Sequence, residues 1–266
     1  MSLSIPTRVF IIPYRGRERD KVIFMNHMKT VVLAEQPESS YEMYFAHQKD
    51  ERPFNRGAMK NIGFLAMKDK YPDHYKDMIF IFNDVDTVPI QKDLIDYYTT
   101  AGSVKHYYGF EFALGGIFAI TGSDFEKTGG FPNFWGWGLE DNTMYDRCIQ
   151  RGLIIDRSMF YKPRDPSIRS ISCLPTRVIS KKDSYVYKFG TPDNMHEIRN
   201  LTWTFNEEYI DITSFECRMN HMDQIYDNFD ITRPGSARIP IYMPGNNNNN
   251  PATNGLRRDW RMFKQR

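Results

Sequence analysis

The chain has 266 residues and a formal net charge of +2, and 41% of its residues are hydrophobic, 26% charged and 15% aromatic. This composition excludes a disordered, collagen-like or disulfide-dense chain, and the length suffices for one large domain or a domain with a second lobe. The charge is nearly balanced, and the longest apolar runs, such as 78–82, fall far short of the roughly 20 residues that cross a bilayer. We therefore predict neither nucleic-acid binding nor a membrane span.

The three cysteines, Cys148, Cys173 and Cys217, are odd in number and widely spaced. Because no pair has the Cys-x-x-Cys spacing of a zinc site, reduced structural thiols are the simpler interpretation. Reduced thiols favour a reducing compartment, and no signal-peptide pattern opens the chain. We therefore expect a soluble, cytoplasmic protein that is a monomer or a weak oligomer.

Hydrophobic periodicity predicts strands that alternate with helices over the first ninety residues. In chain order we expect a strand at 8–12 that ends at Pro13, a helix at 19–33 and a strand at 41–46. A second helix presents Phe54, Ala58, Ile62 and Leu65 on one face and runs to about Lys70. A third strand follows at 78–82. Such alternation is typical of an α/β fold with a mostly parallel, doubly wound sheet. Ligands of such sheets bind at the carboxyl ends of the strands, where 13–17 and 84–86 are placed.

The alternation of predicted strands and helices is lost after about residue 160, and the sequence becomes rich in loops. We expect a catalytic core over 1–160 and a loop-rich C-terminal lobe over 161–243 that completes the site. Residues 244–266 contain five consecutive asparagines and then a basic segment, which indicates a linker and a tail. The tail is either solvated or docked on an acidic surface.

Two carboxylates separated by one residue follow the predicted strand at 78–82. Strand alternation places Asp84 and Asp86 on one side and Val85 on the other. Oxygen ligands in a loop suit Mn²⁺ or Mg²⁺ held jointly with the phosphates of a substrate. The pair alone is also consistent with a turn or a helix cap, so its position after a buried strand is what favours a metal site.

The most specific signal is the stretch 129–142, which reads Gly-Gly-Phe-Pro-Asn-Phe-Trp-Gly-Trp-Gly-Leu-Glu-Asp-Asn. Glycines let the backbone approach a ligand closely, and the indoles of Trp135 and Trp137 offer flat apolar faces of the kind that bind sugars. Glu140 and Asp141 supply adjacent carboxylates, one to hold acceptor hydroxyls and one to take a proton. Acids in the first turn of a helix are the alternative interpretation.

Taken together, these motifs resemble the β-1,4-galactosyltransferase family, which are inverting glycosyltransferases of the GT-A fold that use UDP-sugars and manganese. Pro-Tyr-Arg-Gly-Arg at 13–17 is similar to the family's Pro-Phe-Arg-Asn-Arg. Phe-Asn-Arg-Gly at 54–57 and Asn-Ile-Gly-Phe at 61–64 are similar to its Phe-Asn-Arg-Ala and Asn-Val-Gly-Phe.

The later motifs follow in the family's order. Phe-Asn-Asp-Val-Asp-Thr-Val-Pro at 82–89 is similar to Phe-Ser-Asp-Val-Asp-Leu-Ile-Pro. Gly115 and Gly116, followed by 129–142, are similar to Gly-Gly-Val and to a segment that contains Trp-Gly-Trp-Gly-Gly-Glu-Asp-Asp. The likeness covers about 8–155 and implies a Rossmann-like GT-A core.

The resemblance implies a role for each matching residue. Asp141 would be the base that deprotonates the acceptor hydroxyl, Glu140 would orient the acceptor with Trp135 and Trp137, and Asp86 would ligate the metal. The residues implied for the donor are Pro13, Tyr14, Arg15, Arg17, Phe54, Arg56, Asp84, Val85, Gly115, Gly116, Trp137 and Gly138. Guanidinium groups suit phosphate oxygens, and the ring of Phe54 can stack on uracil.

The sequence departs from the family pattern in three ways. The family completes its metal site with a histidine past the acidic motif, whereas the nearest candidate here is His196, with Asp165 as a rival. Leu139 and Asn142 replace a glycine and an aspartate. Ala113 stands where galactose-transferring members carry an aromatic residue, so we expect room for an N-acetylhexosamine in the donor.

We therefore predict a metal-dependent enzyme that transfers a hexose or N-acetylhexosamine from a UDP-sugar to a hydroxyl of a glycan, glycoprotein or glycolipid. The expected cofactor is Mn²⁺, with Mg²⁺ as the alternative. A glycosyltransferase-like protein that binds nucleotide or glycan without catalysis is one rival. A nucleotidyltransferase is another, although it leaves the Trp-Gly-Trp-Gly segment unexplained. Because family members usually lie in the Golgi lumen behind an anchor, we expect that location only if the chain is a shortened form.

Overall fold

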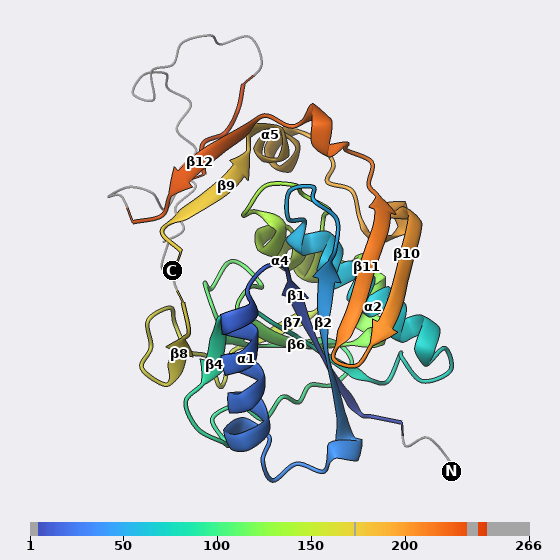
Figure 1. Cartoon of the computed structure of the whole chain (residues 1–266), viewed down its shortest axis with the longest axis vertical. Coiled ribbons are helices and arrows are strands. Elements are labelled where there is room, and N and C mark those ends of the chain that lie inside the picture. The colour runs from blue at the N-terminus through green and yellow to red at the C-terminus, as the bar shows by residue number, and fades with distance from the viewer. Residues whose placement is uncertain (1–4, 173, 233–238, 244–266) are drawn as a thin grey trace.

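The computed structural model describes residues 5–172, 174–232 and 239–243. Within these residues the largest feature is an eight-stranded sheet in the order β10-β11-β2-β1-β3-β6-β5-β7 (Figure 1). Its strands are β1 (Arg8–Tyr14), β2 (Tyr41–Gln48), β3 (Ile79–Asn83), β5 (Ser103–Tyr108), β6 (Ile117–Thr121), β7 (Ile154–Asp156), β10 (Arg199–Asn206) and β11 (Tyr209–Glu216). Two small sheets pair β4 (Thr87–Pro89) with β8 (Ile168–Ser170) and β9 (Thr176–Ser180) with β12 (Tyr226–Asp230).

Helices cover both faces of the large sheet. The α-helices of the described part are α1 (Glu18–His27), α2 (Arg56–Lys70), α3 (Gly122–Thr128), α4 (Glu140–Gln150) and α5 (Lys181–Phe189). Alternate residues of β1 enter two different cores, as strand geometry requires. Val9 and Ile11 pack in the core that contains residues of α2, α3 and α4, whereas Phe10 and Ile12 pack in the core on the α1 side.

The predicted α/β fold with a mostly parallel sheet is confirmed. The pairs β11-β2, β2-β1, β1-β3 and β5-β7 are parallel, and β3-β6, β6-β5 and β10-β11 are antiparallel. The sequence predicts a lobe over 161–243, but this region divides in two. β10 and β11 extend the central sheet, and β9, β12 and α5 lie together beyond the upper ends of β1 and β2 in Figure 1.

The expected end of the first strand at Pro13 is wrong by two residues. β1 continues to Tyr14 because Pro13 and Tyr14 remain in register with Ala46 and His47 of β2. The pairing of β1 with β3 ends at Ile11, so Pro13 lies where the strand has one neighbour, a position that tolerates proline. The helix predicted over 19–33 also divides, into α1 and a π-helical turn at Met28–Val32.

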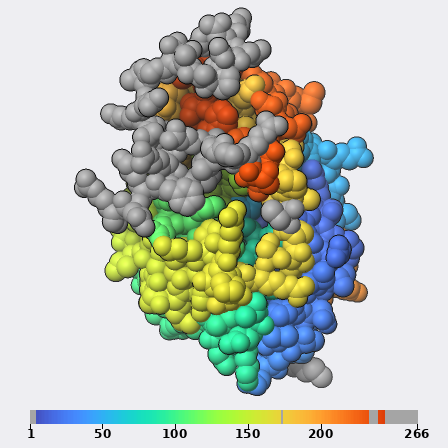
Figure 2. All heavy atoms as spheres, turned by 90° about the vertical axis from the view of Figure 1, so that its left-hand side faces the viewer, coloured from blue at the N-terminus to red at the C-terminus, as the bar shows by residue number. Residues whose placement is uncertain are grey.

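The segment between α4 and β9 lies on the surface beside α1. Figure 2 shows these residues, coloured yellow-green to yellow, on the face next to the blue N-terminal residues. No helix in the described ranges is both long enough and apolar enough to cross a membrane. Cys148 and Cys217 are free thiols, as expected, whereas Cys173 and the predicted tail at 244–266 lie outside the described residues.

Candidate active site

The predicted site residues come from loops and helix starts at one edge of the sheet. Arg15 and Arg17 follow β1, Asp84 and Asp86 follow β3, and Arg56 begins α2. The start of α2 is fixed by Asn55, whose Oδ1 accepts a hydrogen bond of 2.9 Å from the backbone N–H of Ala58. Asn55 Nδ2 also donates to the carbonyl of Asn133 at 3.0 Å, which ties this helix start to the glycine-rich stretch before α4.

Arg56 stands at the centre of the arrangement. Its Nη2 lies 2.5 Å from Asp84 Oδ1, and its Nη1 lies 2.6 Å from Glu140 Oε1 and 2.8 Å from Asp141 Oδ2. Burial alone would lower the pKa of Arg56, but the charges of Asp141, Asp84 and Glu140 raise it. One guanidinium therefore connects the predicted donor-binding loop with both carboxylates of the predicted catalytic pair.

Glu140 and Asp141 form the first turn of α4, as the alternative interpretation of the motif expected, and they have opposite electrostatic surroundings. Burial and then the charge of Asp141 raise the pKa of Glu140, whose buried Oε2 has no hydrogen-bond partner among the described residues. Burial would also raise the pKa of Asp141, but the charges of Arg56 and Lys60 outweigh it and lower that pKa. Of the two, Asp141 is the carboxylate that is kept ionised, and an ionised carboxylate is what a proton acceptor requires.

Gly115 lies against Asp141, whereas its neighbour Gly116 lies against Tyr108. A Cβ atom at Gly115 would lie 2.5 Å from Asp141 Oδ2, so only glycine leaves the carboxylate in place. The adjacent N–H of Leu114 donates to the Asp141 carbonyl at 2.9 Å. Gly116 has a φ of 69°, in the left-handed region that favours glycine. Of the predicted Gly-Gly pair, Gly115 therefore borders the candidate base directly.

Asp86 is the residue that best fits a metal ligand. Its Oδ2 accepts a hydrogen bond of 3.1 Å from Arg17, and its Oδ1 accepts one of 3.2 Å from the hydroxyl of Thr87. Burial and then the negative charge of Asp84 raise the pKa of Asp86. A divalent cation would relieve that repulsion, and Mn²⁺ or Mg²⁺ is usually bound by one or two carboxylates together with substrate phosphates. The residues present therefore fit a metal that is shared with a diphosphate.

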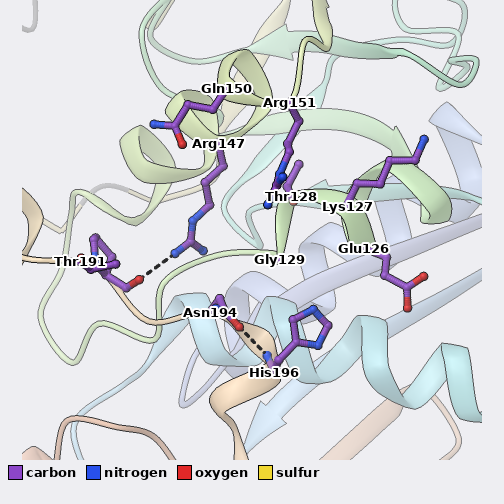
Figure 3. Close-up of a pocket in the computed structure, with 11 residues that line it drawn as sticks. Glu126, Lys127, Thr128, Gly129, Arg147, Gln150, Arg151, Thr191, Asn194 and His196 are labelled. Atoms are coloured by element: carbon purple, nitrogen blue, oxygen red, sulfur yellow. Dashed lines mark hydrogen bonds between the residues drawn. The ribbon is translucent and has the colours of Figure 1, made fainter.

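The expectation that His196 completes this metal site is not met. His196 is exposed on a short turn and lines a cavity of about 270 Å³ with Arg147, Asn194 and Glu126, and Asp86 is absent from that lining (Figure 3). Among the described residues, no group of three or more His, Cys, Asp or Glu side chains could hold a metal, so Asp84, Asp86 and His196 do not converge. The turn is fixed elsewhere, because Met195 N donates to the carbonyl of Gly129 at 2.9 Å.

Some of the residues implied for the donor are half-buried, and others are core residues. The guanidinium of Arg15 lies 5.7 Å from the centre of the half-buried Phe54 ring, so these two side chains can bind a ligand together. Pro13, Tyr14 and Val85 are buried instead, and the Tyr14 hydroxyl donates to Glu18 at 2.9 Å. The structure therefore gives these three side chains a packing role beneath the arginines and the aspartates, in place of the implied contact with the nucleotide.

The two tryptophans have different surroundings. Trp135 is 2% exposed, stacks on Phe215 at 5.6 Å and donates to the carbonyl of Met219 at 2.7 Å, so it is a core residue and does not present the flat sugar surface we expected. Trp137 is half-buried, and its ring stacks on Phe229 at 6.4 Å. Only Trp137 keeps the position of a residue at the edge of the site.

The loop between Trp137 and α4 carries one of the departures from the family pattern. Leu139 has a φ of 71°, a left-handed conformation that suits the family's glycine better than leucine. A Cβ at the neighbouring Gly138 would lie 2.3 Å from the Ile239 side chain. The described segment 239–243 therefore packs on this loop.

Sequence reasoning missed Lys60, which is 1% exposed and whose Nζ lies 2.9 Å from Asp141 Oδ1. A signal was present, because Lys60 follows Arg56 by four residues and so shares a helix face with it, among apolar residues where a lysine is unusual. It also missed Ser172 and Asp20, which both contact Arg17.

Comparisons with known proteins agree with this site. A family model for the N-terminal region of glycosyl transferase group 7 matches residues 4–100, and one for the N-terminal domain of galactosyltransferase matches 97–169. Human β-1,4-galactosyltransferase 2 is 28% identical over 86% of this chain, and bovine β-1,4-galactosyltransferase 1 is 31% identical over 55%. The chain spans 60% of the length of the human relative and 37% of the bovine one.

The fold is also similar to a solved structure. The catalytic domain of Drosophila β-1,4-galactosyltransferase 7, in complex with xylobiose, superposes with a TM-score of 0.59 and 19% identity, covering 80% of this chain and 95% of that one. A second structure of that enzyme contains manganese, UDP-Gal and xylobiose. The two family models together match most of the chain, over the region that carries Arg56, Asp84, Asp86 and Asp141. The chain belongs to the β-1,4-galactosyltransferase family.

Proposed function

We propose that this protein is a metal-dependent inverting glycosyltransferase that transfers a hexose or an N-acetylhexosamine from a UDP-sugar to an acceptor hydroxyl. The observation that carries the proposal is that one guanidinium, Arg56, joins the candidate base Asp141 to Asp84 of the metal-binding loop. In a single displacement the acceptor oxygen and the leaving phosphate oxygen lie on opposite sides of one carbon. The base and the diphosphate site must therefore be close neighbours, and the contacts of Arg56 with both Asp84 and Asp141 support this arrangement.

The residues of the chain divide the work of this reaction. The acceptor oxygen forms a bond to the anomeric carbon, the bond from that carbon to UDP breaks, and Asp141 takes the hydroxyl proton. Arg15, Arg17 and Arg56 attract the diphosphate, whose charge grows as it leaves. Phe54 is suited to stack on the uracil, and Trp137 lies on the loop expected to cover donor and acceptor. UDP departs with the electron pair of the broken bond.

Asp86, with Asp84 beside it, is the side chain that would hold the metal. A bound Mn²⁺, or Mg²⁺ in its place, supplies positive charge next to the departing diphosphate. Arg17 is paired with Asp86 in the present structure, so metal binding requires that this ion pair opens or is shared.

The sugar of the donor is set by the residues beside the Gly-Gly pair. Ala113 is small and buried, and Leu114 points into the core. An alanine at this position leaves space that an aromatic residue would fill, which favours a donor with an N-acetyl group at C2. The acceptor is a hydroxyl of a glycan, free or attached to protein or lipid.

A second candidate is a family member that binds nucleotide or glycan without transferring the sugar. The observation that favours it is that both oxygens of Asp141 are paired with cations, which weakens a base. In the part of the chain that the structure describes, no third His, Cys, Asp or Glu side chain joins Asp84 and Asp86, which points in the same direction.

One assay separates the two candidates. The purified protein is incubated with UDP-Gal, UDP-Glc, UDP-GalNAc and UDP-GlcNAc, each with a panel of saccharide acceptors, in Mn²⁺ and in chelator, and released UDP is measured. Transfer predicts UDP release that requires metal, and a product with inverted anomeric configuration by NMR. UDP binding by calorimetry without release from any donor supports the second candidate. Turnover of UDP-Gal alone contradicts the donor preference inferred from Ala113.

A further inference from the structure

The ammonium group of Lys60 is buried against the candidate base. Lys60 is 1% exposed, its Nζ lies 2.9 Å from Asp141 Oδ1, and the same atom lies 4.3 Å from the centre of the Phe131 ring. Burying a lysine is costly unless the charge is paired. A methionine or leucine would fill this position at less cost, so stability alone does not explain a lysine here.

Lys60 and Arg56 each bind one oxygen of the Asp141 carboxylate. The two residues lie one turn apart on the same face of α2, and each contacts a different oxygen, Lys60 the Oδ1 and Arg56 the Oδ2. Asp141 Oδ2 is also the oxygen that faces Gly115 and the predicted donor site. Oδ1 is thus the anchored oxygen, and Oδ2 is the one placed toward substrates.

The charge balance of the cluster depends on Lys60. In the described residues around Arg56, three carboxylates, those of Asp84, Glu140 and Asp141, face only two cations, Arg56 and Lys60, so loss of either cation leaves a larger excess of negative charge. Arg56 is also the group that a bound diphosphate would attract. If Arg56 turns toward phosphate, Lys60 is the cation that stays with Asp141.

We propose that Lys60 is a positioning residue that holds Asp141 by Oδ1, keeps it ionised, and leaves Oδ2 to accept the proton of the acceptor hydroxyl. This inference rests on the proposed function, and it identifies the residue that keeps the base of that reaction ionised and in position. It makes the base independent of Arg56, which is then able to change partners when the donor binds.

Other groups that face Asp141 support this assignment. They are Arg56 on α2, Glu140 on α4 and His106 on β5. Burial and then the charge of Arg157 lower the pKa of His106 to about 4, so His106 is neutral at pH 7 and does not replace the charge of Lys60. Glu140 is a carboxylate, and together with burial its charge would raise the pKa of Asp141 if Lys60 were removed.

The test compares Lys60→Met with Lys68→Met. Lys68 is on the same helix and is paired with Glu126, away from the site, so it controls for loss of a lysine from α2. We expect kcat of Lys60→Met at pH 7 to fall about 10- to 100-fold, and KM for the UDP-sugar to change little. We expect the acidic limb of its pH profile to move upward by about 1–3 pH units and activity to recover partly at higher pH. Lys68→Met should behave as wild type.

A second readout does not depend on turnover. The carboxyl group of Asp141 is titrated by infrared difference spectroscopy against Asp141→Asn, in wild type and in Lys60→Met. A higher pKa of Asp141 in Lys60→Met supports the proposal, and an unchanged pKa overturns it, as does a fall in kcat that is equal at every pH. If wild type releases no UDP from any donor, the proposed function fails, while the titration still decides the part that concerns Lys60.

Discussion

Arg56 Nη1 lies 2.6 Å from Glu140 Oε1, so a cation at the start of α2 holds a carboxylate buried at the start of α4. This pair closes one side of the site, because Asp141 follows Glu140 and shares the same nitrogen. Glu140 nevertheless has one oxygen without a partner, and burial with the charge of Asp141 raises its pKa. The same cluster therefore stabilises the ionised form of Asp141 and disfavours the ionised form of Glu140.

The raised pKa of Glu140 predicts a pH-dependent effect of Glu140→Gln. Above about pH 4.3 the unfolded chain has released this proton while the folded protein still binds it, so wild-type stability falls as pH rises through that window. In Glu140→Gln this side chain does not titrate, so the variant does not have this fall in stability. We expect the stability of Glu140→Gln relative to wild type to increase with pH above about 4.3, by at most about 1.4 kcal/mol per pH unit. Urea unfolding at several pH values measures it.

Glu126→Gln is the matched control for that experiment, because its carboxyl group shifts in the opposite direction. Burial would raise the pKa of Glu126, but hydrogen bonds from Lys68 and Tyr75 lower it. The stability that this pair contributes is lost as pH falls through the folded pKa, so Glu126→Gln should lose stability relative to wild type as pH rises toward about 4.3 and then level off. The same sign for both variants would contradict the assigned surroundings of Glu140.

Gly115→Ala should impair the reaction and leave the fold intact. The backbone of Gly115 is outside the left-handed region, so alanine is tolerated there, but its Cβ would lie 2.5 Å from Asp141 Oδ2. Displacing a catalytic group by a fraction of an ångström to 1 Å costs up to about 100-fold in rate. Steady-state turnover and the thermal midpoint measure the two effects. Gly190→Ala, whose nearest new contact is a backbone oxygen, at 3.2 Å and away from Asp141, should leave turnover unchanged.

The metal site predicts different outcomes for Asp86→Asn and His196→Ala. We expect Asp86→Asn to weaken Mn²⁺ binding in the presence of UDP by more than the roughly 10- to 100-fold that loss of an outer partner costs. His196→Ala should bind Mn²⁺ as wild type does, because His196 lines a separate cavity. Electron paramagnetic resonance of free Mn²⁺ measures both. A strong effect of His196→Ala would place that histidine back in the metal site.

The first half of the fold could be predicted from the sequence because its signals are local. The strands around 8–12 and 78–82 and the helix to Lys70 are apolar runs with regular spacing, and the structure has them within two residues. The pairing of β11 with β2 could not be predicted, because it joins residues more than 160 positions apart and the exposed pattern of β10 resembles a loop. Tertiary pairing overrides local signals of this kind.

The site divides in the same way. Arg56, Asp84, Asp86 and Asp141 could be named from motifs, and the structure brings Arg56 into contact with both Asp84 and Asp141. The burial of Trp135 could not be named, since a glycine-rich segment gives no sign that Phe215 covers its ring. The pairing of Lys60 with Asp141 could not be predicted either, because an ion pair between α2 and α4 leaves no local pattern in the sequence.

The most direct test of the account is UDP release by wild type and by Asp141→Asn, with the active donor, acceptor and Mn²⁺, together with UDP binding by both proteins. Because a positioned base contributes about 10²–10⁴ in rate, we predict a fall of that size in release by Asp141→Asn, with UDP and Mn²⁺ binding retained. Release within a few-fold of wild type would show that Asp141 is not the base and would contradict the proposed mechanism.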